Sequence, residues 1–189
     1  MTDYKSRGLE LLEEHIKNRN LIKHNLAAAA LMRALAKRFG EEEGAEAWEI
    51  AGLVHDLDWE KTAENPMEHG RAGAEILMKE GFPEEIVRAV KRHNFMAGEE
   101  PPETMLEKAL YYGEEITGLI VAAALISPEK KLSAITPENI LNRFKEKAFA
   151  RGVNRELLSQ APDKLGLNLE ELANIALEAM REISGELGL

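Results

Sequence analysis

Apolar residues recur at the three- and four-residue spacing of an α-helix in almost every segment of this chain. No segment alternates apolar and polar residues in the way that a half-buried strand requires. The pattern therefore predicts an all-α fold, a helical bundle of about eight or nine helices. We expect these helices over residues 3–17, 20–38, 42–55, 66–79, 83–93, 103–126, 137–148 and 169–183, with a short one over 154–160.

Several of the predicted helices carry clear start or stop signals. Asn65 and Asn168 are each followed three residues later by a glutamate, which is the arrangement of a capping box. Thr136 precedes a proline, the residue favoured in a first helical turn. Gly40 and Gly81 follow apolar runs, and we expect each of them to end a helix.

The chain has 189 residues and no linker long enough to separate domains, so we expect residues 1–189 to form a single domain. Its longest apolar run, over residues 118–126, is much shorter than the ~18 residues of a membrane span. The N-terminal sequence lacks the apolar core of a signal peptide. We therefore expect a cytoplasmic protein with no membrane association. A single glutamine, no cysteine and many charged residues also suit a thermophile.

Charge and cysteine content exclude several classes of function. The 24 basic and 34 acidic residues give a net charge of −10, which repels polyanions, so we expect no nucleic-acid partner. The absence of cysteine excludes disulfides, thiolate metal sites and thiol nucleophiles. Any metal in this protein must therefore be held by histidines and carboxylates. The sequence leaves the oligomeric state open, a homodimer included.

Four of the five histidines lie on the apolar faces of four different predicted helices: His24, His55, His69 and His93. For any one of them, a core histidine satisfied by a hydrogen bond is the more common situation. Four inward-facing imidazoles are harder to explain in this way, because each neutral ring needs a partner for both of its nitrogens. A shared metal centre would satisfy all four rings together.

Carboxylates also occur where the surrounding sequence is apolar. Asp56 directly follows His55 at the end of an apolar helix, and Glu114 and Glu115 stand in the middle of the predicted helix over 103–126. A buried carboxylate costs several kcal/mol unless it is paired or bound to a cation. The alternative is that one or both glutamates reach solvent or pair with a basic side chain. Gly113 and Gly118 would let another helix or a ligand approach them closely.

These residues resemble a known family. His24, the pair His55-Asp56 and a later acidic residue are similar to the H…HD…D pattern of the HD-domain superfamily of metal-dependent phosphohydrolases. Further segments resemble a small prokaryotic branch of it, often labelled HDIG-type, and the likeness covers nearly the whole chain. These segments are Glu68-His69-Gly70, Arg92-His93-Asn94, the residues 109–111 and 117–120, and the residues 144–150.

The resemblance implies a role for each matching residue. His24, His55 and Asp56 would be ligands of a divalent metal, and Glu114 would take the fourth position, where the family has an aspartate. Because glutamate is one methylene longer, the metal could shift or the side chain could bind it through water. His69 and His93, with Arg92 beside them, would hold either a second metal or the phosphate of the substrate.

The implied chemistry is hydrolysis of a phosphate ester by metal-activated water, with one or two ions of Mn, Fe, Co, Ni, Zn or Mg. Besides Asp56, we expect Asp58 to orient or deprotonate that water. Lys61, Arg71 or Arg92 could hold phosphate oxygens, although each could equally be an ordinary surface charge.

We therefore expect a metal-dependent phosphohydrolase that acts on a small phosphomonoester or phosphodiester, such as a nucleotide. Two alternatives remain open. Some HD-fold members with extra histidines are di-iron oxygenases, and bound iron that responds to oxygen would favour that function. The second alternative is a non-catalytic module that senses a metal or a ligand. In that case Glu114, which stands where the family has an aspartate, marks the loss of activity.

Overall fold

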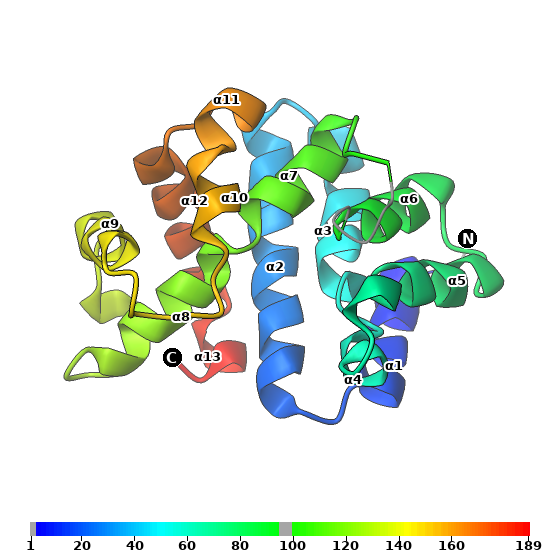
Figure 1. Cartoon of the computed structure of the whole chain (residues 1–189), viewed down its shortest axis with the longest axis horizontal. Helices are drawn as coiled ribbons and strands as arrows, with labels where there is room; N and C mark the ends of the chain where they lie inside the picture. Colours follow the sequence, from blue (N-terminus) through cyan, green and yellow to red (C-terminus); the bar gives the residue numbers. More distant parts are fainter. Residues whose placement is uncertain (1–2, 95–99) are drawn as a thin grey trace.

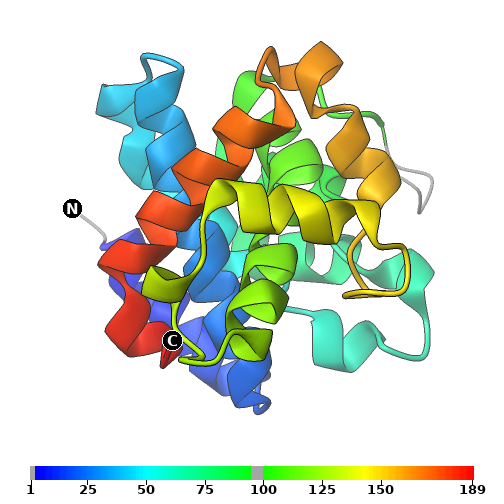
Figure 2. The same cartoon turned by 90° about the vertical axis from the view of Figure 1, so that its left-hand side faces the viewer.

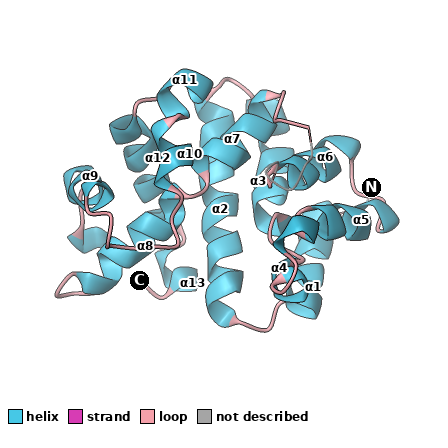
Figure 3. Cartoon of the chain, viewed as in Figure 1, coloured by secondary structure: helices cyan, strands magenta, loops and turns pink. Residues whose placement is uncertain are grey.

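The computed structural model describes residues 3–94 and 100–189, and all regular secondary structure in this part of the chain is helical (Figure 3). The all-α fold is therefore confirmed. The helices are α1 (Tyr4–His15), α2 (Arg19–Arg38), α3 (Ala45–Val54), α4 (Trp59–Thr62), α5 (Arg71–Lys79), α6 (Glu84–Arg92), α7 (Met105–Gly113), α8 (Ile116–Ile126), α9 (Pro137–Lys145), α10 (Arg155–Ser159), α11 (Ala161–Leu165), α12 (Leu169–Glu182) and α13 (Ser184–Leu187). Short 3-10 turns are η1 (Glu42–Gly44), η2 (Pro66–Glu68) and η4 (Leu132–Ala134).

Helix α2 stands at the centre of the molecule (Figure 1). Helices α1 and α3 to α6 lie on one side of it, and α8 to α12 lie on the other. After a quarter turn about the vertical axis, α9 lies in front of the C-terminal helices (Figure 2). Helix α2 buries apolar side chains on most of its faces, including Leu31, Met32 and Leu35, because it contacts helices on both sides.

Helices α2 and α3 approach each other more closely than side chains normally allow. A Cβ atom at Gly52 of α3 would lie only 2.6 Å from the carbonyl oxygen of Ala28 on α2. The missing side chain therefore lets the two backbones touch. This contact sets the spacing between His24 on α2 and His55 at the end of α3.

We expect Gly52→Ala to lower the free energy of unfolding by about 2–3 kcal/mol, because the new methyl group must push α3 away from the backbone of α2. Urea denaturation measures this change. Gly44→Ala is the matched control, since a Cβ at Gly44 has no neighbour within 4 Å. Equal stability of the two variants would contradict this account of the helix contact.

Three predicted helices are interrupted in the structure. The predicted helix over 66–79 is instead the 3-10 turn η2 followed by α5, and Gly70 joins them with a φ of 82°. The expected capping bond of Asn65 is absent. The predicted helix over 103–126 is divided at residues 114–115 into α7 and α8. Likewise, the predicted helix over 42–55 consists of η1 and α3.

Other predicted boundaries are confirmed. Thr136 and Asn168 both form reciprocal capping boxes at the starts of α9 and α12. The short helix expected over 154–160 is α10.

The stretch Met105–Ile126 is long and apolar enough to cross a membrane, but 61% of its most apolar window is buried inside the protein, as in a core helix.

Candidate metal centre

Four histidines and two carboxylates from distant parts of the sequence converge on one centre, and all of them except the buried His55 line a cavity of about 510 Å³. Each of them lies in a helix or just beyond the end of one. His24 is on α2, and His55 and Asp56 follow α3. His69 follows η2, His93 follows α6, and Glu114 occupies the break between α7 and α8. The residues that the sequence singled out as metal ligands are thus brought together.

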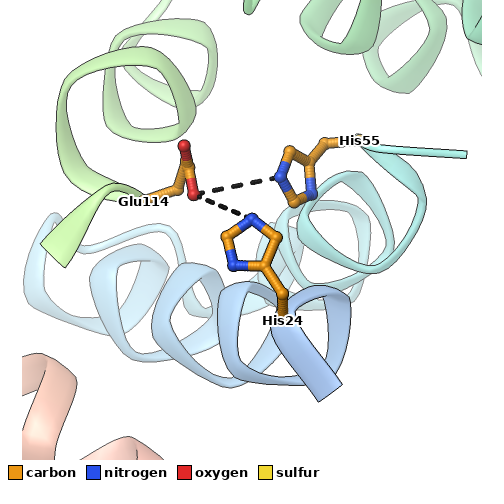
Figure 4. A group of neighbouring side chains, drawn as sticks. All are labelled: His24, His55 and Glu114. Atoms are coloured by element: carbon orange, nitrogen blue, oxygen red, sulfur yellow. Dashed lines mark ion pairs between the residues drawn. The ribbon is translucent and has the colours of Figure 1, made fainter. Parts of the chain in front are cut away.

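The first group consists of His24, His55 and Glu114, whose side chains point toward one another (Figure 4). Glu114 Oε2 lies 3.4 Å from His24 Nε2 and 3.9 Å from His55 Nε2. These three ligand atoms all lie within 4.8 Å of one another, so a single ion could contact all of them.

The second group consists of Asp56, His69 and His93. Asp56 Oδ1 lies 3.2 Å from His69 Nε2 and 3.6 Å from His93 Nε2, and these two nitrogens are 2.9 Å apart. Asp56 also contacts the first group, because its Oδ2 lies 3.5 Å from His24 Nε2 and its Oδ1 lies 3.4 Å from His55 Nε2. Its carboxylate is therefore shared by both groups.

The four imidazoles are oriented by bonds to their other ring nitrogen. Each Nδ1 lies near an oxygen: the carbonyl of Gly52 for His55 (2.9 Å), the carbonyl of Val90 for His93 (2.6 Å), Asp58 Oδ1 for His69 (2.8 Å) and Thr117 Oγ1 for His24 (3.4 Å). A carbonyl or carboxylate oxygen accepts a hydrogen bond from Nδ1–H, which leaves the Nε2 lone pair free for a metal. All four Nε2 atoms point into the shared centre.

Two buried atoms in the centre lack any hydrogen-bond partner: His55 Nε2 and Glu114 Oε2. Such atoms are rare in folded proteins, and a divalent cation between them would satisfy both. The residues therefore fit a metal site. Because four of the six candidate donors are imidazoles, the donor set suits Mn, Fe, Co, Ni or Zn better than Mg, which prefers oxygen ligands.

Burial and charge shift the pKa values of these groups in opposite directions. Burial lowers the pKa of His55 to about 3, so this ring is neutral at physiological pH. Burial also lowers the pKa of His69, but hydrogen bonds to Asp56 and Asp58 and their negative charges outweigh it and raise the pKa to about 9. Burial, followed by the charges of Glu115 and Asp56, raises the pKa of Glu114 well above its usual range.

Metal affinity should therefore increase with pH. Without a metal, His69 keeps its proton below pH 9, and this proton must leave before Nε2 can bind an ion. The raised pKa of Glu114 acts in the same direction. We expect the association constant for Ni²⁺ to rise by about tenfold or more per pH unit between pH 6.5 and 8.5. Isothermal titration calorimetry at three pH values measures it. An association constant independent of pH would contradict the assigned protonation states.

Asp58 does not have the position expected of a residue that activates water. It is completely buried, its Oδ1 lies 2.8 Å from His69 Nδ1, and its Oδ2 accepts hydrogen bonds from the N–H groups of Gly70 (2.9 Å) and Gly73 (2.7 Å). Both oxygens are therefore occupied by the protein. In this arrangement Asp58 orients His69 and holds the start of α5, while a direct role toward water stays a prediction.

The basic residues considered for phosphate binding lie outside the cavity lining. Lys61 is exposed on α4. Arg92 is buried and forms ion pairs with Glu100, Glu103 and Glu107, so its guanidinium is already engaged by carboxylates. Arg71, the first residue of α5, does not line the cavity either. Among the described lining residues there is no lysine or arginine, and Asp56, Glu114 and Glu115 all contribute carboxylates.

Several residues of the site were not singled out for it by the sequence. Trp59, 45% exposed, packs edge-on against the His69 ring at 4.7 Å and lines the cavity. Asn25 is completely buried, and its Oδ1 accepts a hydrogen bond from the Asp56 N–H at 3.4 Å. Asn25 lies beside His24 and directly before the apolar run over residues 26–32, and this position was a usable signal for it. Nothing local in the sequence distinguishes Trp59.

Histidines and carboxylates at the ends of several helices form a buried centre in this all-helical protein. This arrangement is typical of helical metal-binding domains. The HD-domain family model matches residues 21–141, which include His24, His55, Asp56 and Glu114. The chain therefore belongs to the HD-domain family, whose members are mostly metal-dependent hydrolases.

Curated relatives are similar over parts of their length. Ribonuclease Y of Desulforudis audaxviator is 28% identical over 176 residues, covering 89% of this chain and 32% of the relative. The uncharacterized protein MJ0778 of Methanocaldococcus jannaschii is 33% identical over 90 residues, 46% of this chain and 52% of the relative. Ribonuclease Y of Lawsonia intracellularis is 29% identical over 141 residues, 73% of this chain and 26% of the relative. The chain thus spans between a quarter and about half of these relatives. No solved structure matches it significantly.

Proposed function

We propose that this protein is a metal-dependent phosphohydrolase that cleaves a small phosphomonoester or phosphodiester, such as a nucleotide, at the centre formed by its four histidines, Asp56 and Glu114. The observation that carries the proposal is the pair of adjoining ligand groups joined by Asp56, with four Nε2 atoms and two carboxylates converging on one centre. Membership of the HD-domain family supports it.

The residues of the chain divide the work of such a reaction. A divalent ion bound here would activate water and neutralise charge on the phosphoryl group. The histidines hold their Nε2 atoms in fixed directions through the bonds at Nδ1, and Asp58 does so for His69 from outside the centre. Because no basic side chain is among the described lining residues, the phosphate must be bound at the metal centre itself.

RNA is the second candidate substrate, because several of the relatives are named ribonucleases. The net charge of −10 and the acidic cavity lining argue against a long polyanion. A small phosphodiester and a short oligoribonucleotide contain the same reacting group, so both belong in the same assay.

The test is metal content by elemental analysis together with hydrolysis of p-nitrophenyl phosphate, bis(p-nitrophenyl) phosphate, nucleotides and a short RNA, after loading with Mn, Co, Ni or Zn. We expect one or two equivalents of metal and metal-dependent release of product from at least one small ester. Loss of both metal and activity in His55→Ala, with retention of both in His15→Ala, would tie the activity to the centre.

Other results would favour another function. Failure to bind any of these ions would contradict the proposal. Bound metal without turnover of any phosphate ester would favour a sensing module. Bound iron with a change of absorbance under oxygen would favour a di-iron oxygenase.

A further inference from the structure

Residues 146–154, which we call the wall segment, connect α9 to α10 without forming a helix. In Figures 1 and 2 this segment is the yellow to orange stretch between α9 and α10. Ala150, Gly152, Val153 and Asn154 line the same cavity as the histidines and carboxylates of the metal centre. The wall segment lies beyond residues 21–141, the part that the HD-domain family model matches.

A single arginine holds the backbone of the wall segment. The Arg155 guanidinium, at the start of α10, donates hydrogen bonds to the carbonyl oxygens of Arg143 (3.5 Å), Phe144 (2.9 Å), Glu146 (3.1 Å), Phe149 (2.5 Å) and Ala150 (3.2 Å). Its N–H donors thus bind carbonyls at the end of α9 and in the wall segment, and the carbonyls of Phe144 and Phe149 are among them. Ala150, one of the residues so held, has a left-handed φ of 44°, which a non-glycine residue adopts only under constraint.

The end of the wall segment is fastened to the helix beside the metal centre. The N–H of Asn154 donates a hydrogen bond of 3.0 Å to the carboxylate of Glu115, the neighbour of the candidate ligand Glu114. A Cβ at Gly118 of α8 would lie 3.3 Å from Val153 Cγ2, so the valine packs directly on the backbone of α8. Glu115 and Gly118 therefore connect the wall segment to the helix break that holds the candidate ligand Glu114.

Much of the cavity lining is apolar. Val153 and Leu157 line the cavity, as do Leu21 and Leu110 from other helices. A phosphate bound at the metal centre would leave the organic part of its ester within this cavity. Apolar side chains favour an apolar or aromatic group there, because contact removes apolar surface from water.

We propose that residues 146–154 are the specificity-determining wall of the cavity, which contacts the organic group of a phosphate ester, and that Arg155 is the positioning residue that holds this wall in place. This inference rests on the proposed function in one respect, the binding of the phosphate at the metal centre. Arg155 does not line the cavity and acts through the backbone of the wall segment and of the end of α9.

The test uses binding of two phosphonates, which are not hydrolysed, to the full-length protein loaded with Mn²⁺. Phenylphosphonate carries an aryl group and methylphosphonate does not. In Arg155→Ala we expect the dissociation constant of phenylphosphonate to increase about tenfold and that of methylphosphonate to change less than about twofold. Hydrogen exchange of the amides over 146–154 should become faster in the same variant.

Arg181→Ala is the matched control. Arg181 also donates to backbone carbonyls, those of Leu132 and Ile135, but it lies outside the cavity lining. It should leave both dissociation constants unchanged. Val153→Ala is a second variant that removes wall surface without touching the Arg155 hydrogen bonds, and we expect about a threefold loss for phenylphosphonate alone.

The inference is overturned if both phosphonates weaken equally in Arg155→Ala, which would place the effect at the metal centre or in the whole fold. It is also overturned if the wild-type protein binds the two phosphonates equally well or binds neither. Because hydrolysis is not measured, a protein that binds phenylphosphonate through the wall segment but hydrolyses no ester would contradict the proposed function alone.

Discussion

Asp56→Asn is expected to reduce kcat/KM for a phosphate ester by about a thousandfold or more and to lower the metal content of the purified protein. The physical reason is that its two oxygens face both groups of histidines, at 3.2–3.6 Å from their Nε2 atoms. Asparagine preserves the shape of the side chain but removes its negative charge and one acceptor oxygen. Elemental analysis and steady-state kinetics on the same sample measure both effects.

Glu107→Gln is the control, because it removes a buried carboxylate that is not a candidate metal ligand. Glu107 is 1% exposed and pairs with Arg88 and Arg92, away from the metal centre. Its replacement should cost stability but leave the metal content unchanged. If Asp56→Asn kept its metal and its activity, Asp56 would not be a shared ligand and the assignment of the centre would be wrong.

Removal of the metal is expected to lower the melting temperature by roughly 10 °C. Metal that binds only the folded protein at a thousand times its dissociation constant contributes about 4 kcal/mol, and 1 kcal/mol corresponds to about 2–4 °C in a chain of this size. The metal-free centre also leaves His55 Nε2 and Glu114 Oε2 buried without partners. Thermal denaturation with and without a chelator measures the difference.

His15→Ala and His55→Ala separate the specific effect from a general one. His15 ends α1 and is half-buried outside the centre, so its variant should respond to the chelator as the wild type does. His55→Ala should show a much smaller response, because one ligand is already missing. A melting temperature that the chelator leaves unchanged in the wild-type protein would mean that no metal supports the fold.

Helical periodicity was enough to predict the fold class and most helices, because apolar side chains recur at helical spacing in every long helix. It could not predict the breaks. Gly70 interrupts the expected helix over 66–79 since its φ of 82° lets its own N–H and that of Gly73 bind the carboxylate of Asp58. These two hydrogen bonds join residues that are 12 and 15 positions apart, and no local pattern in the sequence indicates them.

The candidate ligands could be identified because their chemistry is unusual for their surroundings: histidines and acids on apolar faces. Asp58 was harder to place, since proximity in sequence to the His55-Asp56 pair does not show which partners occupy its oxygens. Arg92 was likewise considered as a ligand of the phosphate, but its guanidinium donates a hydrogen bond to Glu107 on α7. The wall segment overlaps the end of the helix predicted over 137–148, which stops at Lys145 in the structure, and only the tertiary structure places the segment beside the metal centre.

The lack of basic side chains among the described residues that line the cavity affects how a substrate arrives. An anion approaching this protein meets the field of a chain with a net charge of −10 and three carboxylates at the cavity, and it would gain attraction only near metal ions bound at the centre. Dissolved salt weakens the distant repulsion more than the close contact, because screening acts over about 10 Å at 0.1 M ionic strength. Encounter with an anionic ester should therefore become faster as ionic strength rises, the reverse of the behaviour of enzymes that attract their substrates from a distance.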